Sequence, residues 1–208
     1  MIDVRVFCLF GLMCTLVAVP LLPQRAQAVK VWPTPRVTAL QACTTAMRRA
    51  YEWDHDARLI FVTGRPFDFR FDGRSSRWGF RCVSGDGVRI AGFDINMAHY
   101  TSPVRMTKNL KRPANCLDLV NRAAWKIDSP EAWKIARRNG LDIWLAKHPS
   151  FDLSYSGNRF ELAANKRDGP YWLVSCSAKA ATGTRKRERI AFGISAANGR
   201  LLFRLGSP

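Results

Sequence analysis

Short stretches in which apolar residues alternate with small or charged ones recur along this chain, between turns that contain Gly and Ser. Trp78, Phe80 and Cys82 form one such stretch, with Gly73 before it and Gly85-Asp86-Gly87 after it. Alternation with a period of two is typical of strands with one buried face. Gly-rich turns between such stretches favour hairpins. The chain therefore predicts antiparallel strands, at about residues 58–62, 67–71, 78–82, 88–97, 151–155, 159–163, 171–177, 190–196 and 201–205, with 117–127 also extended.

Two helices are expected among the strands. The first covers about residues 37–51, where apolar side chains recur at helical spacing. The second begins at Ser129, which can cap it, with Pro130 suited to the first helical position. It should stop at Asn139-Gly140, and a short helical piece over 141–147 follows.

The two halves of the chain share a pattern. Residues 78–82 match 172–176, each beginning with Trp and ending with Cys, and Arg-Ile-Ala recurs at 89–91 and 189–191. The α+β class is expected, as two small helix-plus-antiparallel-sheet units in tandem. Their expected limits are 29–103 and 117–208, joined by a linker over 104–116 that is rich in Pro and cations. Chance similarity of two hairpins is the alternative, and one continuous sheet or two separate units both remain open.

The first 28 residues have the pattern of an export signal. Arg5 precedes an apolar run over 6–22, and Ala26-Gln27-Ala28 forms a small-x-small cleavage site. A retained membrane anchor is the rival interpretation, because a run of about 17 residues is the shortest that crosses a bilayer. Met13 before Cys14 is too bulky for a lipid-anchor site. The pattern predicts a protein of the periplasm or one secreted from the cell, with no transmembrane segment after cleavage.

The chain is strongly basic, with a formal net charge of +17 over 208 residues. Removing the segment 1–28 takes away Arg5, Arg25 and Asp3 and leaves +16. Such a charge favours polyanionic partners: anionic lipid, lipopolysaccharide or an acidic wall polymer, with nucleic acid the least available outside the cytoplasm. The densest cluster supplies the candidate contacts, although a solvated hairpin tip between two strands is its more ordinary explanation: Arg185, Lys186, Arg187 and Arg189.

Four cysteines remain after signal cleavage: Cys43, Cys82, Cys116 and Cys176. An even number in an oxidising compartment predicts two disulfides, with three connectivities that the spacing leaves open. Buried reduced thiols, or one pair with two free thiols, are the alternatives. The gaps between these cysteines do not resemble a zinc site.

No catalytic, metal or cofactor motif stands out. His55 lies between two aspartates, and a polar turn explains three adjacent residues better than a metal corner. His99 and His148 have no nucleophile close in sequence, and His148 beside Pro149 closes a helix where an imidazolium suits the negative end. We therefore expect no catalytic residue, no metal and no cofactor.

The second half resembles the PepSY-like domains of exported bacterial proteins. The similarity rests on Lys126–Ala132, on Asn139-Gly140, on Leu145–Pro149, on the aromatic strand 171–176 and on the closing segment 194–202. It covers about residues 126–205 and extends faintly to the first half. The resemblance implies a helix packed on a small antiparallel sheet and a non-catalytic protein-binding or inhibitory role in the envelope.

Two functions are compatible with these observations. The first is an exported, non-catalytic binding or interaction module of the cell envelope, whose partner is a protein or an anionic envelope polymer or lipid. The alternative is an envelope enzyme with a Cys/His site assembled between the two halves.

Overall fold

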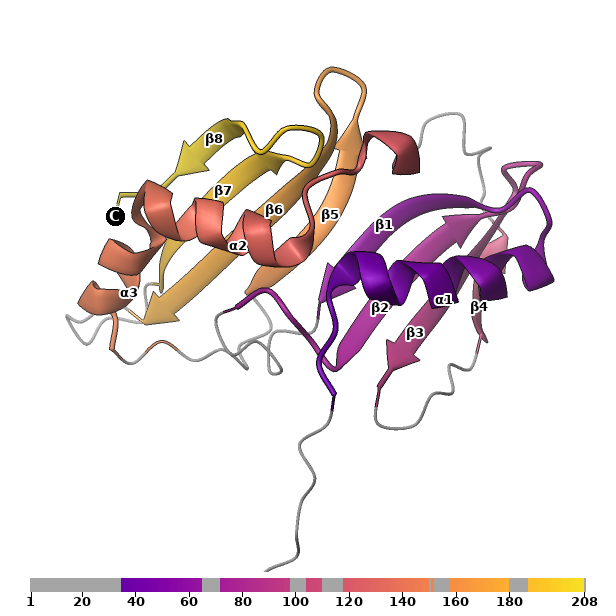
Figure 1. The fold of residues 1–208 in the computed structure, drawn as a ribbon, viewed down its shortest axis with the longest axis horizontal. Coiled ribbons are helices and arrows are strands. Elements are labelled where there is room, and N and C mark those ends of the chain that lie inside the picture. The colour runs from indigo at the N-terminus through magenta and orange to yellow at the C-terminus, as the bar shows by residue number, and fades with distance from the viewer. Residues whose placement is uncertain are drawn as a thin grey trace, which may run out of the picture. The chain divides into compact units, whose positions relative to one another are not determined.

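The alternating stretches form one continuous antiparallel sheet of eight strands (Figure 1). The computed structural model describes residues 35–64, 72–97, 104–109, 118–149, 151, 158–179 and 187–207. The strand order is β4-β3-β2-β1-β5-β6-β7-β8. The strands are β1 (Arg58–Gly64), β2 (Arg77–Val83), β3 (Arg89–Asn96), β4 (Val104–Asn109), β5 (Arg159–Asn165), β6 (Gly169–Lys179), β7 (Arg187–Ser195) and β8 (Leu201–Leu205).

Each half of the chain contributes a helical region followed by four strands. The halves join at the middle of the sheet, where β1 pairs with β5 through Val62 opposite Leu162 and Thr63 opposite Glu161. Residues 33–208 form one compact unit. The α+β class is confirmed, and of the two arrangements left open by the sequence the structure has the continuous sheet.

Helix α1 (Ala39–Trp53) begins two residues after the expected start. Val37 cannot join the helix because it forms a β-bridge with Ser75. Thr38 is the N-cap and forms a capping box with Gln41. The buried face of α1 carries only small or sulfur-containing side chains, which lets the helix lie close to the sheet: Ala39, Ala42, Cys43, Ala46, Met47 and Ala50.

The second helical region is continuous but kinked where the sequence predicted a stop. Helix α2 (Ser129–Ala136) runs into a π-helical segment, η4 (Arg137–Leu141), and then into α3 (Asp142–Lys147). Asn139 and Gly140 leave helical geometry, and Gly140 has φ of 113°, a conformation that favours glycine. The Asn-Gly pair therefore bends the helix instead of ending it.

The N-cap of α2 is the residue before Ser129, and not Ser129 itself as the sequence predicted. Asp128 is the N-cap of α2. The Ser129 hydroxyl instead accepts a hydrogen bond from the backbone N–H of Ala39 at 3.0 Å, and Asp128 Oδ1 accepts one from Leu40 at 3.1 Å. Asp128 and Ser129 thus satisfy free N–H groups at the start of α1 as well, a contact between residues almost 90 positions apart.

The predictions of a linker over 104–116 and of an extended segment over 117–127 are partly wrong. Residues 104–109 form edge strand β4, antiparallel to β3. Within 118–127 there is a 3-10 turn, η3 (Arg122–Ala124), capped by Asn121. This stretch contacts β1 through a backbone hydrogen bond from the N–H of Val120 to the Leu59 carbonyl. The strands expected at 67–71 and 151–155 fall largely outside the described residues.

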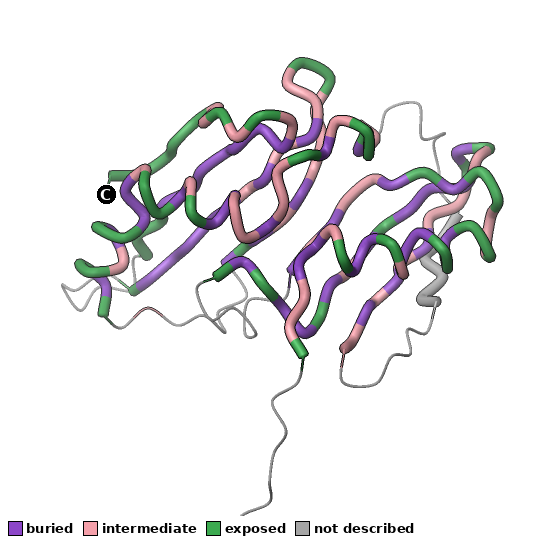
Figure 2. Tube along the Cα trace, in the orientation of Figure 1, coloured by how far each residue is buried: buried purple, intermediate pink, exposed green. Residues whose placement is uncertain are grey.

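The core lies between the sheet and the helices, which pack on the same face of the sheet (Figure 1). Burial alternates along β2, β3 and β5, as Figure 2 shows. Trp78 of β2 and Trp172 of β6 contact each other at 6.5 Å between ring centroids. Trp78 donates its indole N–H to the carbonyl of Val37, and Trp172 donates its own to Ile127. Val37 and Ile127 each precede the N-cap of a helix, so the two tryptophans anchor the helix starts in the same way.

The strand register shows how the two halves correspond. Trp78 lies opposite Ile95 and Phe80 opposite Phe93. In the second half Trp172 lies opposite Ile194 and Val174 opposite Phe192. The two Arg-Ile-Ala segments are one residue out of step, because Cys82 pairs with Ala91 whereas Cys176 pairs with Ile190.

Candidate binding surface

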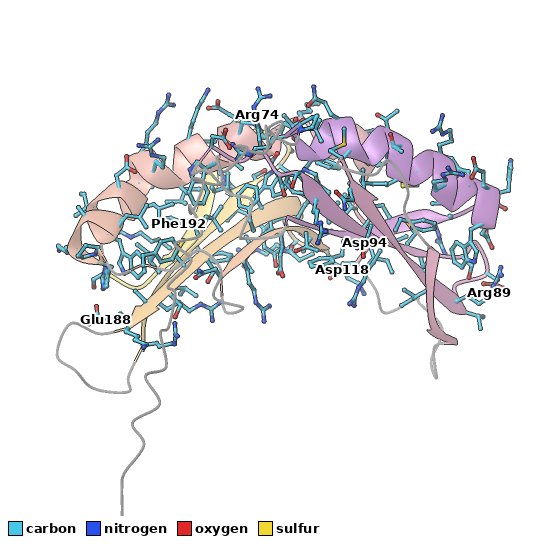
Figure 3. The ribbon with its side chains drawn as sticks, turned by 90° about the horizontal axis from the view of Figure 1, so that it is seen from below. Arg74, Arg89, Asp94, Asp118, Glu188 and Phe192 are labelled. Atoms are coloured by element: carbon cyan, nitrogen blue, oxygen red, sulfur yellow. The ribbon has the colours of Figure 1, made fainter. Side chains whose placement is uncertain are left out.

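One face of the sheet is left without helices, and we call it the helix-free face (Figure 3). Strand alternation sends every second side chain to it. It carries more cations than carboxylates: Arg77, Arg81, Arg159, Lys179, Arg187 and Arg189 against Asp94 and Glu161. The basic character of the chain is therefore expressed on a rigid, hydrogen-bonded scaffold.

Glu161 lies at the centre of this face, on the central strand β5. It is paired in register with Thr63 of β1 and Leu173 of β6. Its side chain is 17% exposed, and Arg159 Nη1 approaches its Oε2 at 3.8 Å with 55% exposure of the arginine side chain. Burial raises the pKa of Glu161, and the charges of Arg159, Arg189 and Arg81 act in the opposite direction. One half-buried carboxylate thus stands among three guanidinium groups, and we call Arg81, Arg159 and Arg189 the arginine cluster.

Two members of the cluster sit in defined surroundings. Arg189 Nε donates a hydrogen bond to the Ser175 hydroxyl at 2.8 Å, across from β7 to β6. Arg81 faces Phe61 on one side and Gly92 on the other.

The candidate polyanion contacts divide into two groups. Arg185 and Lys186 lie outside the described residues. Arg187 and Arg189 are exposed residues of β7 and alternate onto the helix-free face. Glu188 between them points to the other face, where its carboxylate accepts from His148 Nε2 at 2.9 Å.

The sequence interpretation missed Arg81, Arg159 and Glu161. Their positions were visible as the polar members of alternating strands, but the alternation alone does not say which strands are neighbours. The pairing of β1 with β5 brings Arg81 and Arg159 to one surface, although they are 78 positions apart. Charge density along the chain pointed to residues 185–189 because it counts only sequence neighbours.

An apolar strip borders the cluster toward the edge strand β8. The ring of Phe203 lies directly over Gly193, where any side chain would collide with it. Tyr171 meets the same ring edge-on at 6.3 Å between centroids. Leu205, at the end of β8, is 62% exposed. The helix-free face therefore offers apolar contact next to its cations.

The expected disulfides are not found among the described cysteines: Cys43, Cys82 and Cys176 are free and buried. Cys116 lies outside the described residues. Cys82 lies against Met47, with 3.9 Å between the two sulfur atoms. Burial raises the pKa of the Cys43 thiol, and the nearby Arg122 guanidinium acts in the opposite direction. These thiols are packed as small apolar groups, and burial raises the pKa of Cys82 and of Cys176 to about 12.

The two described histidines, His55 and His148, contact residues other than cysteine. His55 lies in the turn after α1 with Nδ1 3.0 Å from Asp56, as the polar-turn interpretation expected. His148 is buried at the end of α3, stacked on Trp144, with Nδ1 2.7 Å from the Trp144 carbonyl oxygen. His99 lies outside the described residues. Among the described residues, no group of three or more His, Cys, Asp or Glu side chains has the arrangement of a metal site.

The similarity of the chain to known proteins is low. No protein-family model and no curated protein matches the chain. The crystal structure of "a putative lipoprotein" from Clostridium difficile 630 is similar with a TM-score of 0.49 and 11% identity, over 80% of this chain and 93% of that one. Within the described residues, no helix is long and apolar enough to cross a bilayer.

Proposed function

We propose that this protein is an exported, non-catalytic binding protein of the cell envelope whose helix-free face binds an anionic envelope lipid or polymer. The observation that carries the proposal is the arginine cluster around Glu161. Export is proposed from the N-terminal signal pattern. Guanidinium groups suit this role because they bind phosphate and carboxylate oxygens in a two-pronged geometry and are always charged.

The geometry of the cluster supports a surface that binds extended anions. The guanidinium groups come from three strands, β2, β5 and β7, so several anionic groups of one polymer can be bound at once. Each contact is exposed and individually weak, but contacts to one polymer add up. The apolar strip with Phe203 and Leu205 next to the cluster suits a partner that also presents acyl chains or sugar rings.

We also propose that the two halves are PepSY-like units fused into one sheet. Support comes from the repeated order of a helical region and four strands. The matched indole hydrogen bonds of Trp78 and Trp172 to the residue before each helix cap add to it. In this arrangement the fusion leaves one wide helix-free face in place of two narrow ones.

The test is a binding measurement with purified protein and two probes, vesicles containing anionic phospholipid and purified lipopolysaccharide, over a range of salt concentrations. Binding should weaken as salt rises. The variant Arg81→Glu/Arg159→Glu/Arg189→Glu should bind at least tenfold more weakly. The matched control carries the same charge change on the helices, Arg49→Glu/Lys134→Glu/Arg138→Glu.

The control separates the surface from the total charge. Equal losses in both triple variants would mean that net charge alone drives binding and would refute the assignment to the helix-free face. Retention of a protein partner at high salt, with neither probe bound, would refute the anionic component as partner.

A further inference from the structure

A second surface feature lies on the other side of the molecule, beside α1. A shallow cavity of about 510 Å³ is bounded by one side of α1 and by Arg122 of η3. This volume falls in the range of small-molecule sites in proteins. The lining residues are Thr44, Met47, Arg48, Tyr51, Glu52 and Arg122.

The cavity has an apolar interior and a cationic border. Its floor is the buried thioether side chain of Met47, and the ring of Tyr51, 45% exposed, forms a wall. Arg48 and Arg122 border it from α1 and from η3. The carboxylate of Glu52 forms an ion pair with Arg49 at 2.9 Å. Its partner is therefore neither Arg48 nor Arg122.

Arg122 lies near the buried face of α1. Burial raises the pKa of the Cys43 thiol, one helical turn before Met47, and the nearby Arg122 guanidinium acts in the opposite direction. The turn that carries Arg122 is itself held by the Asn121 side chain, which accepts from Ala123 N at 3.0 Å. The backbone that carries this cation is therefore held in place before an anion binds.

We infer that this cavity binds a small amphiphilic anion, with its single acidic head group between Arg48 and Arg122 and its apolar chain on Met47 and Tyr51. Charge complementarity selects an anion over a neutral or cationic amphiphile. The apolar floor selects an amphiphile over an inorganic anion. The site lies on α1, so it is independent of the helix-free face.

The experiment uses protein with ¹³C-labelled methionine methyl groups and follows the Met47 resonance by NMR. Dodecanoate, dodecyl phosphate, dodecanol and inorganic phosphate are added separately, below their aggregation concentrations. The Met47 methyl should shift and saturate with dodecanoate or dodecyl phosphate, and the tighter of the two identifies the head group. Dodecanol should bind about tenfold more weakly, and phosphate alone should leave the methyl unchanged.

Variants then test the cationic border. Arg122→Gln and, separately, Arg48→Gln should each weaken the binding of the anionic probes about tenfold, with Arg138→Gln as the control of equal charge change. Two variants are used because Arg122→Gln also removes the guanidinium near the Cys43 thiol. Unchanged affinity in both variants, equal binding of dodecanol, or no saturable shift with either anion would overturn the inference. Retained binding of vesicles by Arg48→Gln would show that this site and the helix-free face are separate.

Discussion

At the scale of single residues, Asp128 links the starts of two helices. Its Oδ1 accepts hydrogen bonds from Ser129 N at 2.7 Å and from Leu40 N at 3.1 Å. One carboxylate therefore stands at the positive ends of two helix dipoles, those of α1 and α2. The residue joins the two halves of the chain as well as capping its own helix.

Replacing this carboxylate should cost stability in both halves. Asp128→Ala is expected to lower the free energy of unfolding by about 2 kcal/mol, because two helix starts each lose about 1 kcal/mol of capping. Asp128→Asn should lose about half as much, since the amide oxygen still accepts but carries no charge. The measurement is urea unfolding. The control Asp142→Ala removes a half-exposed carboxylate paired with Arg137 and should cost less than about 0.5 kcal/mol.

Glu161 should make stability depend on pH in a characteristic direction. Because burial raises its pKa in the folded protein, its ionised form is disfavoured by folding. Its contribution is fully present below the ordinary glutamate pKa and is lost as pH rises through the raised value. As pH rises through this range, the free energy of unfolding of the wild type should therefore fall relative to that of Glu161→Gln. A difference that does not change with pH would contradict the burial of this carboxylate.

The buried thiols should be unreactive while the protein is folded. With pKa values of about 12, Cys82 and Cys176 carry almost no thiolate at pH 8. Iodoacetamide at pH 8 should leave both unmodified in the native protein and label both in urea, as read by peptide mass spectrometry. Labelling at the same rate in both conditions, or a disulfide at either residue, would show that the described packing is wrong.

At the scale of elements, a tryptophan of the sheet donates a hydrogen bond to the residue before each helix cap. Trp78 and Trp172 are buried and lie at matching places in β2 and β6. Their indole N–H groups donate to Val37 and Ile127 at 3.0 and 2.8 Å. The direction in which α1 and α2 leave the sheet is thus set by the same contact.

Trp78→Phe and Trp172→Phe should destabilise the protein by similar amounts, about 2 to 3 kcal/mol each. Each substitution leaves a cavity and removes one of the hydrogen bonds that the Val37 or Ile127 carbonyl accepts; Ser75 N and the Trp125 indole still donate to these two carbonyls. Trp53→Phe is the comparison, because the buried indole N–H of Trp53 has no hydrogen-bond acceptor among the described residues. Thermal unfolding should show a smaller loss for it. A loss from one of the two core tryptophans only would contradict their equivalent roles.

Some of these helices and strands could be predicted from the sequence, and others could not. Period-two alternation located β2, β3 and β5 to β8 within a few residues, and helical spacing located α1, because these patterns depend on local neighbours. Strand β4 was missed because Pro103 and its many cations are typical of linkers; pairing with β3 decides its structure. The Ser129 hydroxyl was assigned to its own helix, since a cap on Ala39 depends on contacts that only the folded chain creates.

At the scale of the whole molecule, the sheet separates two surfaces with different chemistry. The helices cover one face and bury the core, and the other face presents the arginine cluster around Glu161 (Figure 3). Strand order could not be predicted from the sequence, so the cluster could not be either. We propose that this face, and not the total charge, selects the partner.

Arginine footprinting tests that claim most directly. The protein is treated with phenylglyoxal with and without anionic vesicles, and modified arginines are quantified by peptide mass spectrometry. The account predicts that vesicles protect Arg81, Arg159 and Arg189 and leave the exposed helical residues Arg49 and Arg138 as reactive as before. Protection of the helical arginines to the same degree, or of none of the cluster, would contradict it.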